Sequence, residues 1–208
     1  MRAGRFITLE GGEGVGKSTQ IALIADVLRG RGKIVTTTRE PGGTPGAEAI
    51  RSLLMTGGED RWNARTEALL FAAARADHVA KLIQPALDRG EWVICDRFVD
   101  STRAYQGGAG GVSDSDILDL HHVGCSGLLP DRTLLFDMPL TASTARASLR
   151  DNGENDRMGM KSSDYYERVA ARFRDLAAAE PARFRLINAD QTREGVTAET
   201  VHALADLL

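Results

Sequence analysis

The sequence has only two cysteines, Cys95 and Cys125, among its 208 residues. Their separation does not match a metal site, and Cys95 stands in an apolar run, which indicates a buried hydrophobic residue rather than a reactive thiol. No apolar run approaches the roughly 20 residues that cross a bilayer. The N-terminus also lacks the apolar stretch of a secretory signal. We therefore expect a cytoplasmic protein that does not associate with membranes.

A basic excess is also missing, because 26 lysines and arginines face 29 acidic residues, a formal net charge of −3. A broad nucleic-acid surface needs such an excess, so we expect no nucleic-acid partner. Most of the basic residues are arginines, which bind phosphate through paired hydrogen bonds; a GC-rich coding sequence explains their number equally well. No repeat, low-complexity tract or linker divides the chain, so we expect one domain over residues 1–208.

A glycine-rich segment near the N-terminus, GGEGVGKS at residues 11–18, is the most informative feature present. It matches the phosphate-loop pattern G-x-x-x-x-G-K-[ST] and lies between an apolar run and a helical pattern, as this motif requires. Its glycines let backbone N–H groups converge on a triphosphate. We expect Lys17 to reach the terminal phosphates and the Ser18 hydroxyl to bind Mg²⁺. The residues predicted to bind the triphosphate are Gly11, Gly12, Glu13, Gly14, Val15, Gly16, Lys17, Ser18 and Thr19.

Short apolar runs alternate with helical patterns along the chain. The expected strands cover residues 6–9, 34–38, 92–95, 133–136 and 184–187. The expected helices cover residues 17–28, 47–54, 64–87, 114–123, 140–150, 164–179 and 194–208, and a further short helix is expected to stop at the glycine pair 107–108. This alternation predicts an α/β fold of the P-loop NTPase type, in three layers, with a five-stranded parallel sheet covered by helices on both faces.

Arginines follow two of the expected strands. In parallel sheets, ligands bind at the carboxyl ends of the strands, where Arg39 and Arg97 both lie. Two guanidinium groups beside the phosphate loop predict a site for a second phosphate group. Asp96, at the end of the third strand, is placed to orient Mg²⁺ or its waters. The alternative is surface ion pairing of each arginine with its acidic neighbour in the chain.

Two helical segments place aromatic and polar side chains on shared faces. Phe71 and Arg75 are four residues apart, so they can stack on a base and hydrogen-bond its edge. Core packing with a salt bridge is the alternative for this pair. Ser101 and Tyr105 repeat the spacing, with Gln106 slightly rotated from them.

A polar, glycine-bearing stretch, DNGENDRMG at residues 151–159, lies between two expected helices. It suits a flexible lid, which we place at residues 150–161; a plain surface loop is the alternative. The stretch also contains D-x-x-G, a GTPase pattern. That interpretation is disfavoured because the pattern follows no strand and no Asn-Lys-x-Asp motif comes after it.

These motifs occur in the order and spacing of a known family. The chain resembles the thymidylate kinases, the bacterial kind in particular, in its phosphate loop, in TREPGG at residues 38–43, in DRF at 96–98 and in the segment 101–107. The resemblance extends over essentially the whole chain, including DYYERV at residues 164–169. It implies transfer of the γ-phosphoryl group of ATP to dTMP, giving dTDP and ADP for dTTP synthesis, with Mg²⁺ and in a homodimer.

The resemblance also implies roles at the second phosphate site. Arg39 and Arg97 would hold the phosphate of dTMP, and Glu13 would contact its sugar hydroxyl. Phe71 would stack on thymine, and Arg75 would bond a carbonyl of the base. The residues expected to bind dTMP are Glu13, Arg39, Pro41, Phe71, Arg75, Arg97, Ser101, Tyr105 and Gln106.

Three of these residues surround the expected nucleoside. By the same resemblance Ser101 and Gln106 line its pocket, and Tyr105 crowds the 2′ position and so disfavours ribonucleotides. Phe98 departs from the tyrosine or histidine that the family leads us to expect after Asp-Arg. A local polar contact is therefore not expected there.

Positive charge for the transferred phosphoryl group must come from outside the loop residues 12–15, which include no cation. Phosphoryl transfer depends mainly on positioning and charge neutralisation. In the bacterial subgroup lid arginines close over ATP, and here Arg146, Arg150 and Arg157 lie near the lid. We expect Arg150, then Arg157, to act on the phosphoryl group together with Lys17 and Arg97.

Two other functions are compatible with the phosphate loop. A kinase of another nucleoside monophosphate would keep both phosphate sites and recognise a different base. A non-catalytic module that reports ATP to a partner would need only the first site, so the arginines at the strand ends count against it.

Overall fold

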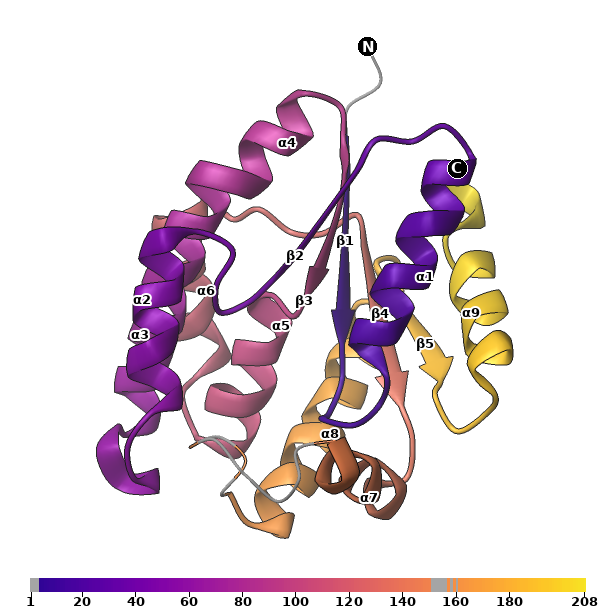
Figure 1. The fold of residues 1–208 in the computed structure, drawn as a ribbon. Coiled ribbons are helices and arrows are strands. Elements are labelled where there is room, and N and C mark those ends of the chain that lie inside the picture. Colours follow the sequence, from indigo (N-terminus) through magenta and orange to yellow (C-terminus); the bar gives the residue numbers. More distant parts are fainter. Residues whose placement is uncertain (1–3, 151–156, 158, 160) are drawn as a thin grey trace.

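The computed structural model describes residues 4–150, 157, 159 and 161–208, with only the backbone of Arg150. Its five strands form one parallel sheet of order β2-β3-β1-β4-β5 (Figure 1). In the central strand, Thr8 lies opposite Cys95 of β3 and Thr133 of β4. The strands are β1 Arg5–Glu10, β2 Val35–Arg39, β3 Trp92–Asp96, β4 Arg132–Asp137 and β5 Phe184–Asn188. All five expected strands are confirmed, although Ile34 precedes β2 and is exposed.

Apolar side chains of the strands pack on both faces of the sheet. Ile7 and Leu9 face a core that includes Ile24 of the first helix. Phe6, on the other face of β1, packs in a second core with Val93 instead. Strands buried on both faces need mostly apolar residues, which is why β1, β3 and β4 contain apolar runs in the sequence, whereas the edge strands β2 and β5 are only partly buried.

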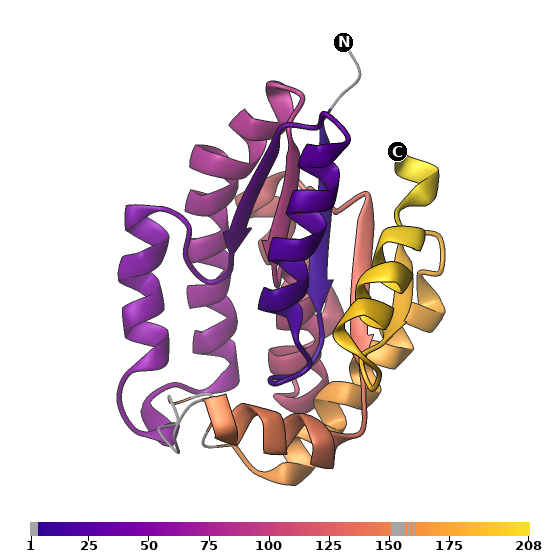
Figure 2. The same ribbon diagram turned by 45° about the vertical axis from the view of Figure 1, so that its right-hand side comes forward.

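Helices form the two outer layers, with α1 and α9 on one face of the sheet (Figure 2). The principal helices are α1 Lys17–Gly30, α2 Pro45–Met55, α3 Ala64–His78, α4 Gln84–Asp88, α5 Val99–Thr102, α6 Asp114–Cys125, α7 Leu140–Arg150, α8 Ser163–Ala179 and α9 Arg193–His202. Short turns of 3-10 helix cover Glu59–Arg61 and Ala205–Leu207. The expected helix 194–208 therefore stops at His202, and its last part is a separate turn.

The expected single helix over residues 64–87 is interrupted by a wide turn. Helix α3 passes into a π-helical segment, Val79–Ile83, before α4 begins. Pro85 is the second residue of α4. Proline has no N–H to donate and its ring collides with the carbonyl group four residues earlier, so the backbone widens before it.

A second wide turn lies beside the phosphate loop. Helix α5 continues as a π-helical segment, Arg103–Ala109, and so passes through the glycine pair that was expected to stop it. The wide turn includes Tyr105 and Gln106, both of which are buried. Wide turns of this kind often mark functional sites because they redirect side chains.

Among the residues that the structure describes, no helix is long and apolar enough to cross a membrane. The cytoplasmic location stays a prediction. Much of the predicted lid, residues 151–156, 158 and 160, lies outside the described residues.

Candidate active site

The phosphate loop leads from β1 into α1, as its motif requires. Gly11 and Gly14 have φ of 129° and 72°. A Cβ atom at Gly14 would lie 2.1 Å from the carbonyl oxygen of Ser143 on α7, so the loop needs glycine there for its turn and its packing. Gly16 precedes α1 and provides no side-chain cap. The N–H groups of the first helical turn can therefore bind an anion.

Lys17 points back into the loop. Its Nζ donates to the carbonyl oxygens of Gly11 and Gly12, at 3.1 and 2.6 Å. Burial, and the nearby guanidinium of Arg97, lower the pKa of this lysine from 10.5 to about 8. A phosphate group bound in the loop would compensate for the lost hydration by placing negative charge beside the ammonium group. The geometry suits a lysine that pairs with an anionic ligand.

The predicted metal ligands, Ser18 and Asp96, lie side by side. Ser18 Oγ donates to Asp96 Oδ2 at 3.4 Å. The other carboxylate oxygen, Oδ1, is buried and has no hydrogen-bond partner among the described residues. A hydroxyl group beside a carboxylate with an unused oxygen is a donor set that suits Mg²⁺ and its bound waters.

A cavity of about 160 Å³ adjoins the phosphate loop at the carboxyl ends of the strands. All nine residues expected to bind the acceptor line it: Glu13, Arg39, Pro41, Phe71, Arg75, Arg97, Ser101, Tyr105 and Gln106. The cavity is also lined by Arg51, Met55 and Thr102, which are not among the residues expected to bind dTMP. Arg51 and Met55 are four residues apart on α2, a spacing that could have indicated a shared face.

The two arginines at the strand ends have different surroundings. Arg97 has φ 69°, an uncommon conformation for a residue other than glycine. Its Nη1 donates to the carbonyl oxygen of Gly11 at 3.0 Å and to Ser101 Oγ at 3.1 Å. Arg39 is about half exposed and pairs with Glu48 at 3.0 Å. Among the described residues, neither forms an ion pair with its acidic chain neighbour, so that alternative is wrong.

Arg75 both forms a buried salt bridge and lines the cavity, the two alternatives that its spacing from Phe71 left open. Its side chain is 2% exposed, and its Nε pairs with Glu40 Oε2 at 2.7 Å. Its Nη2 donates to Thr102 Oγ1 at 2.9 Å. Glu40 is held in turn by His78 Nδ1 at 3.1 Å. Arg75 therefore belongs to a buried ion pair and also lines the cavity with Phe71, in an orientation that its partners fix.

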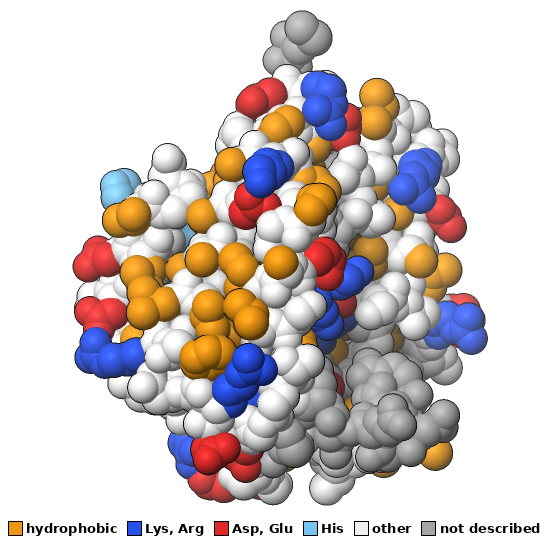
Figure 3. Space-filling model, turned by 60° about the vertical axis from the view of Figure 1, so that its left-hand side comes forward, with side chains coloured by type: hydrophobic (Ala, Val, Ile, Leu, Met, Phe, Trp, Pro, Cys, Tyr) orange, Lys and Arg blue, Asp and Glu red, His pale blue; other side chains and the backbone are white. Residues whose placement is uncertain are grey.

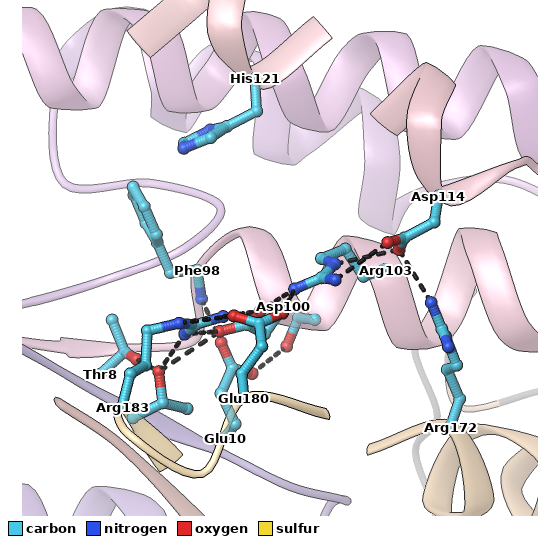
Figure 4. A network of polar contacts seen from close by, with 12 residues as sticks. Thr8, Glu10, Phe98, Asp100, Arg103, Asp114, His121, Arg172, Glu180 and Arg183 are labelled. Atoms are coloured by element: carbon cyan, nitrogen blue, oxygen red, sulfur yellow. Dashed lines mark hydrogen bonds and ion pairs between the residues drawn. The ribbon is translucent and has the colours of Figure 1, made fainter. Parts of the chain in front are cut away.

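Phe98 occupies an apolar site. Its buried ring meets the ring of Phe6 edge-on at 4.8 Å between centroids. The ring of His121 also lies edge-on to it, at 5.4 Å; Figure 4 shows these two side chains. An apolar ring suits these neighbours better than a polar one. The backbone N–H of Phe98 supplies the polar contact here, because it donates to Glu10 Oε1 at 2.8 Å.

Glu10, the last residue of β1, is a buried carboxyl group that the sequence analysis missed. Besides the contact with Phe98, its Oε2 accepts a hydrogen bond from Ser101 Oγ at 2.6 Å. Burial and the nearby carboxylate of Asp100 raise the pKa of Glu10 from 4.5 to about 8. Its only signal in the sequence is an acidic residue that directly ends an apolar strand.

Asp100 connects this carboxyl group to a buried ionic network (Figure 4). It pairs with Arg103 at 3.1 Å and with Arg183 at 2.6 Å. Arg103 continues to Asp114 on α6 and to Glu180 after α8. The network ties α5, α6, α8 and β5 together behind the cavity, so that Ser101 and Glu10 are held from several elements.

Replacing Glu10 by glutamine should make stability less dependent on pH. Because the folded-state pKa lies above the ordinary value, the folded state binds more protons than the unfolded state between about pH 4.5 and 8. The wild type therefore loses stability as pH rises through this window, by roughly a few kcal/mol. Glutamine resembles the protonated acid and does not titrate. We expect the Tm of Glu10→Gln to rise relative to wild type from pH 5 to 8; a constant difference would contradict this account.

Arg157 contacts a buried carboxylate and the end of α2, and its predicted action on the phosphoryl group stays a prediction. Its Nε donates to the carbonyl oxygen of Leu54 at 2.8 Å, and its Nη1 pairs with Glu67 Oε1 at 2.7 Å. Gln106 Nε2 donates to the same carboxylate at 2.9 Å. Arg157 thus lies beside the acceptor cavity rather than over the phosphate loop. The reason is that a buried carboxylate and the carbonyl groups at the end of α2 provide its acceptors there.

The other predicted lid arginines lie on α7. Arg150 ends this helix, and its side chain falls outside the described residues, so its role stays a prediction. Arg146, one turn earlier, donates through Nη1 to the carbonyl oxygen of Ala189 at 3.3 Å. Arg146 therefore reaches the segment that follows β5.

Comparisons with known proteins agree with this geometry. Residues 9–200 match the family described as Thymidylate kinase. A thymidylate kinase of Rhizorhabdus wittichii is 58% identical over 205 residues, which cover 99% of each chain. One of Caulobacter vibrioides is 48% identical over 198 residues, covering 95% of this chain and 94% of the other. The crystal structure of thymidylate kinase from Ehrlichia chaffeensis has a TM-score of 0.78 at 33% identity, covering 97% of this chain and 99% of that one.

A phosphate loop beside an arginine-lined cavity, on a five-stranded parallel sheet, defines a kinase of the P-loop class. The comparisons with known proteins identify the family within this class. The chain belongs to the thymidylate kinase family. It is accordingly an enzyme that phosphorylates dTMP with ATP in the synthesis of dTTP.

Proposed function

We propose that ATP binds on the phosphate loop and dTMP in the adjoining cavity, and that the γ-phosphoryl group passes directly between them. One shared contact carries this proposal. The carbonyl oxygen of Gly11 accepts from Lys17 Nζ at 3.1 Å and from Arg97 Nη1 at 3.0 Å. The cations of the donor and acceptor sites therefore meet at one backbone atom. Phosphate groups bound to them would be neighbours, as direct transfer requires.

On the donor side, the loop N–H groups and Lys17 hold the phosphates of ATP. Ser18 and Asp96 would hold Mg²⁺, and Asp96 Oδ1, which has no hydrogen-bond partner among the described residues, supports this assignment. When bound, Mg²⁺ neutralises charge on the phosphate oxygens and helps to align them. The metal needs few protein ligands because it keeps several waters.

On the acceptor side, Arg39 and Arg97 hold the phosphate of dTMP. Phe71 stacks on thymine, and Arg75 donates to a carbonyl group of the base. Glu13 contacts the sugar hydroxyl. The buried partners of Arg75 support its role, since a guanidinium with a fixed orientation can select a carbonyl group at a fixed position.

The remaining cavity residues shape the nucleoside site. Tyr105 crowds the 2′ position, and its ring lies 5.0 Å from the guanidinium of Arg97, which fixes it near the phosphate site. Pro41, Ser101 and Gln106 complete the wall. A wall without room at the 2′ position favours deoxyribonucleotides.

The chemistry needs no general base, because the nucleophile is already a phosphate oxygen. Lys17 and Arg97 supply positive charge from the loop and from the strand end. Arg150, at the end of α7, remains our candidate for further charge on the transferred group. Arg157 is reassigned to the acceptor side on the basis of its contacts.

We also propose that the enzyme is a homodimer formed through α3 and α6. Leu69 on α3 is 54% exposed and Val123 on α6 is 87% exposed. The two helices pack tightly, since a Cβ atom at Gly124 would lie 3.2 Å from the Cβ atom of Ala76. Apolar side chains gather on this side of the molecule (Figure 3). A contiguous apolar surface on paired helices suits a second copy of the chain.

Replacing Leu69 by glutamate should produce a monomer. A charge buried in an apolar interface loses its hydration and gains no partner. We expect each of the two glutamates in the dimer interface to weaken association by roughly 2 kcal/mol or more. Sedimentation equilibrium measures the change in mass. Leu186→Glu on β5 is the matched control, because Leu186 is 57% exposed but lies elsewhere. A Leu69→Glu protein that remains dimeric would exclude this surface.

A panel of acceptors tests the proposed function. ADP release is measured with dTMP, dUMP, UMP, CMP, AMP and GMP. We expect strong dependence on dTMP. Preference for another monophosphate would mean that the second site recognises a different base. ADP release that does not depend on any acceptor would favour the alternative of a nucleotide-binding module without kinase activity.

A further inference from the structure

A buried carboxylate, Glu67 on α3, lies between Arg157 and the cavity residue Gln106. One oxygen, Oε1, pairs with Arg157 Nη1 at 2.7 Å, and the other, Oε2, accepts from Gln106 Nε2 at 2.9 Å. The three side chains are 3%, 1% and 1% exposed. Three segments far apart in the chain thus meet at one buried carboxylate.

Arg157 is docked on the end of a helix as well as on Glu67. Its Nε donates to the carbonyl oxygen of Leu54 at 2.8 Å, and its backbone N–H to that of Met55 at 3.2 Å. Helix α2 ends at Met55, where the negative end of its dipole favours a cation. The arginine supplies the charge that Glu67 needs, because a buried carboxylate without a cation is costly.

The carboxylate decides which way the amide of Gln106 is oriented. An ionised carboxylate only accepts hydrogen bonds, so the Nε2 of Gln106 must face Glu67. The carbonyl oxygen is then the atom that Gln106 can present to the cavity it lines. Arg75 lines the same cavity and offers only donors.

Together these groups present one acceptor and one donor to a base. A pyrimidine with a ring N–H beside a carbonyl group matches both. In a pyrimidine with an unprotonated ring nitrogen beside an amino group, an acceptor would face the carbonyl oxygen of Gln106 and a donor would face Arg75. The polar groups would then stay unpaired in a buried site, which lowers the affinity for that base.

We propose that Glu67 is a positioning residue that determines base specificity: it orients Gln106 as a hydrogen-bond acceptor, and Arg157 completes this arrangement by docking on Glu67. The inference rests on the proposed placement of the base beside Phe71 and Arg75. Arg157 then acts on the acceptor side, through the same carboxylate that orients Gln106.

Glu67→Gln tests the proposal through a reversal of polarity. The glutamine has a single acceptor oxygen, which the cationic Arg157 takes because charged donors form the stronger bonds. Its amide nitrogen then faces Gln106, whose carbonyl group must turn toward it. Gln106 now presents a donor to the cavity, which suits an unprotonated ring nitrogen.

The measurement is kcat/KM for dTMP and for dCMP in the wild type and the variant. We expect the dTMP to dCMP ratio to fall at least about tenfold in Glu67→Gln, with the loss for dTMP mainly in KM. Glu59→Gln is the matched control, because Glu59 pairs with Lys161 at 3.5 Å but is half exposed and does not contact the cavity. Its ratio should equal that of the wild type.

The outcomes separate the inference from the proposed function. An unchanged ratio in Glu67→Gln, or an equal loss for both nucleotides, overturns the positioning role and leaves Glu67 as packing alone. A wild type that does not prefer dTMP overturns the proposed function itself.

Arg157→Leu provides a second test that does not alter Glu67. We expect KM for dTMP to rise about tenfold while KM for ATP stays unchanged, because the lost contact lies on the acceptor side. Thermal unfolding verifies that the variant is folded. A rise in KM for ATP, or a loss of kcat with both KM values unchanged, would place Arg157 on the donor side and overturn the proposal.

Discussion

Replacing Lys17 by methionine will remove most turnover while the protein remains folded. We expect kcat to fall roughly 10²- to 10³-fold, because a preorganised charge at the transferred phosphoryl group is lost. Burial already disfavours the ammonium group, as its lowered pKa of about 8 shows. An uncharged side chain of similar length should therefore not lower Tm. Steady-state ADP release and thermal unfolding measure the two effects.

Lys33→Met is the control for this substitution. Lys33 precedes β2, at the opposite end of the sheet from the loop, and lies 5.8 Å from the ring of Trp92. We expect it to retain wild-type kcat. If Lys17→Met kept more than about a tenth of wild-type turnover, the loop lysine would not act on the transferred group.

Replacing Arg97 by methionine will affect binding and turnover together. We expect kcat/KM for dTMP to fall roughly 10³-fold, since the guanidinium is the partly buried cation of the proposed acceptor phosphate site. Its contact with the carbonyl oxygen of Gly11, next to that of Lys17, places it at the junction of the two phosphates. Both a higher KM for dTMP and a lower kcat are therefore expected. Steady-state kinetics at varied dTMP separates them.

A second substitution at this position separates charge from backbone conformation. Arg97 has φ 69°, which glycine adopts without strain. Arg97→Gly should lose as much activity as the methionine variant, yet have the higher Tm of the two. Recovery of activity in the glycine variant would mean that the backbone conformation, and not the guanidinium, is what the site requires.

The local parts of the fold could be predicted from the sequence. The strands β1, β3 and β4 are largely apolar because they are buried on both faces, and this property is visible residue by residue. The order β2-β3-β1-β4-β5 was not predictable in the same way, because it depends on pairing between strands far apart in the chain. The wide turn before Pro85 was also missed, since the helical pattern of apolar residues continues through it.

The candidate site shows the same division. The phosphate loop is a contiguous motif, and the strand-end arginines follow from the parallel sheet. Glu10 and Glu67 gave almost no signal, because each acts through partners about 90 residues away in the chain. Arg157 was expected over the donor, and only the tertiary structure shows that it pairs with Glu67.

The sequence by itself determined the fold class, the phosphate loop, the arginines at the strand ends and the family. These features depend on residue type and local spacing, which backbone geometry translates directly into structure. Only the tertiary structure decided which charges share a buried environment: Lys17 with Arg97 at one carbonyl group, Glu10 beside Asp100, and Arg157 on Glu67. The physical reason is that burial makes an unpaired charge costly, and the partner that satisfies it comes from wherever the fold brings the chain close.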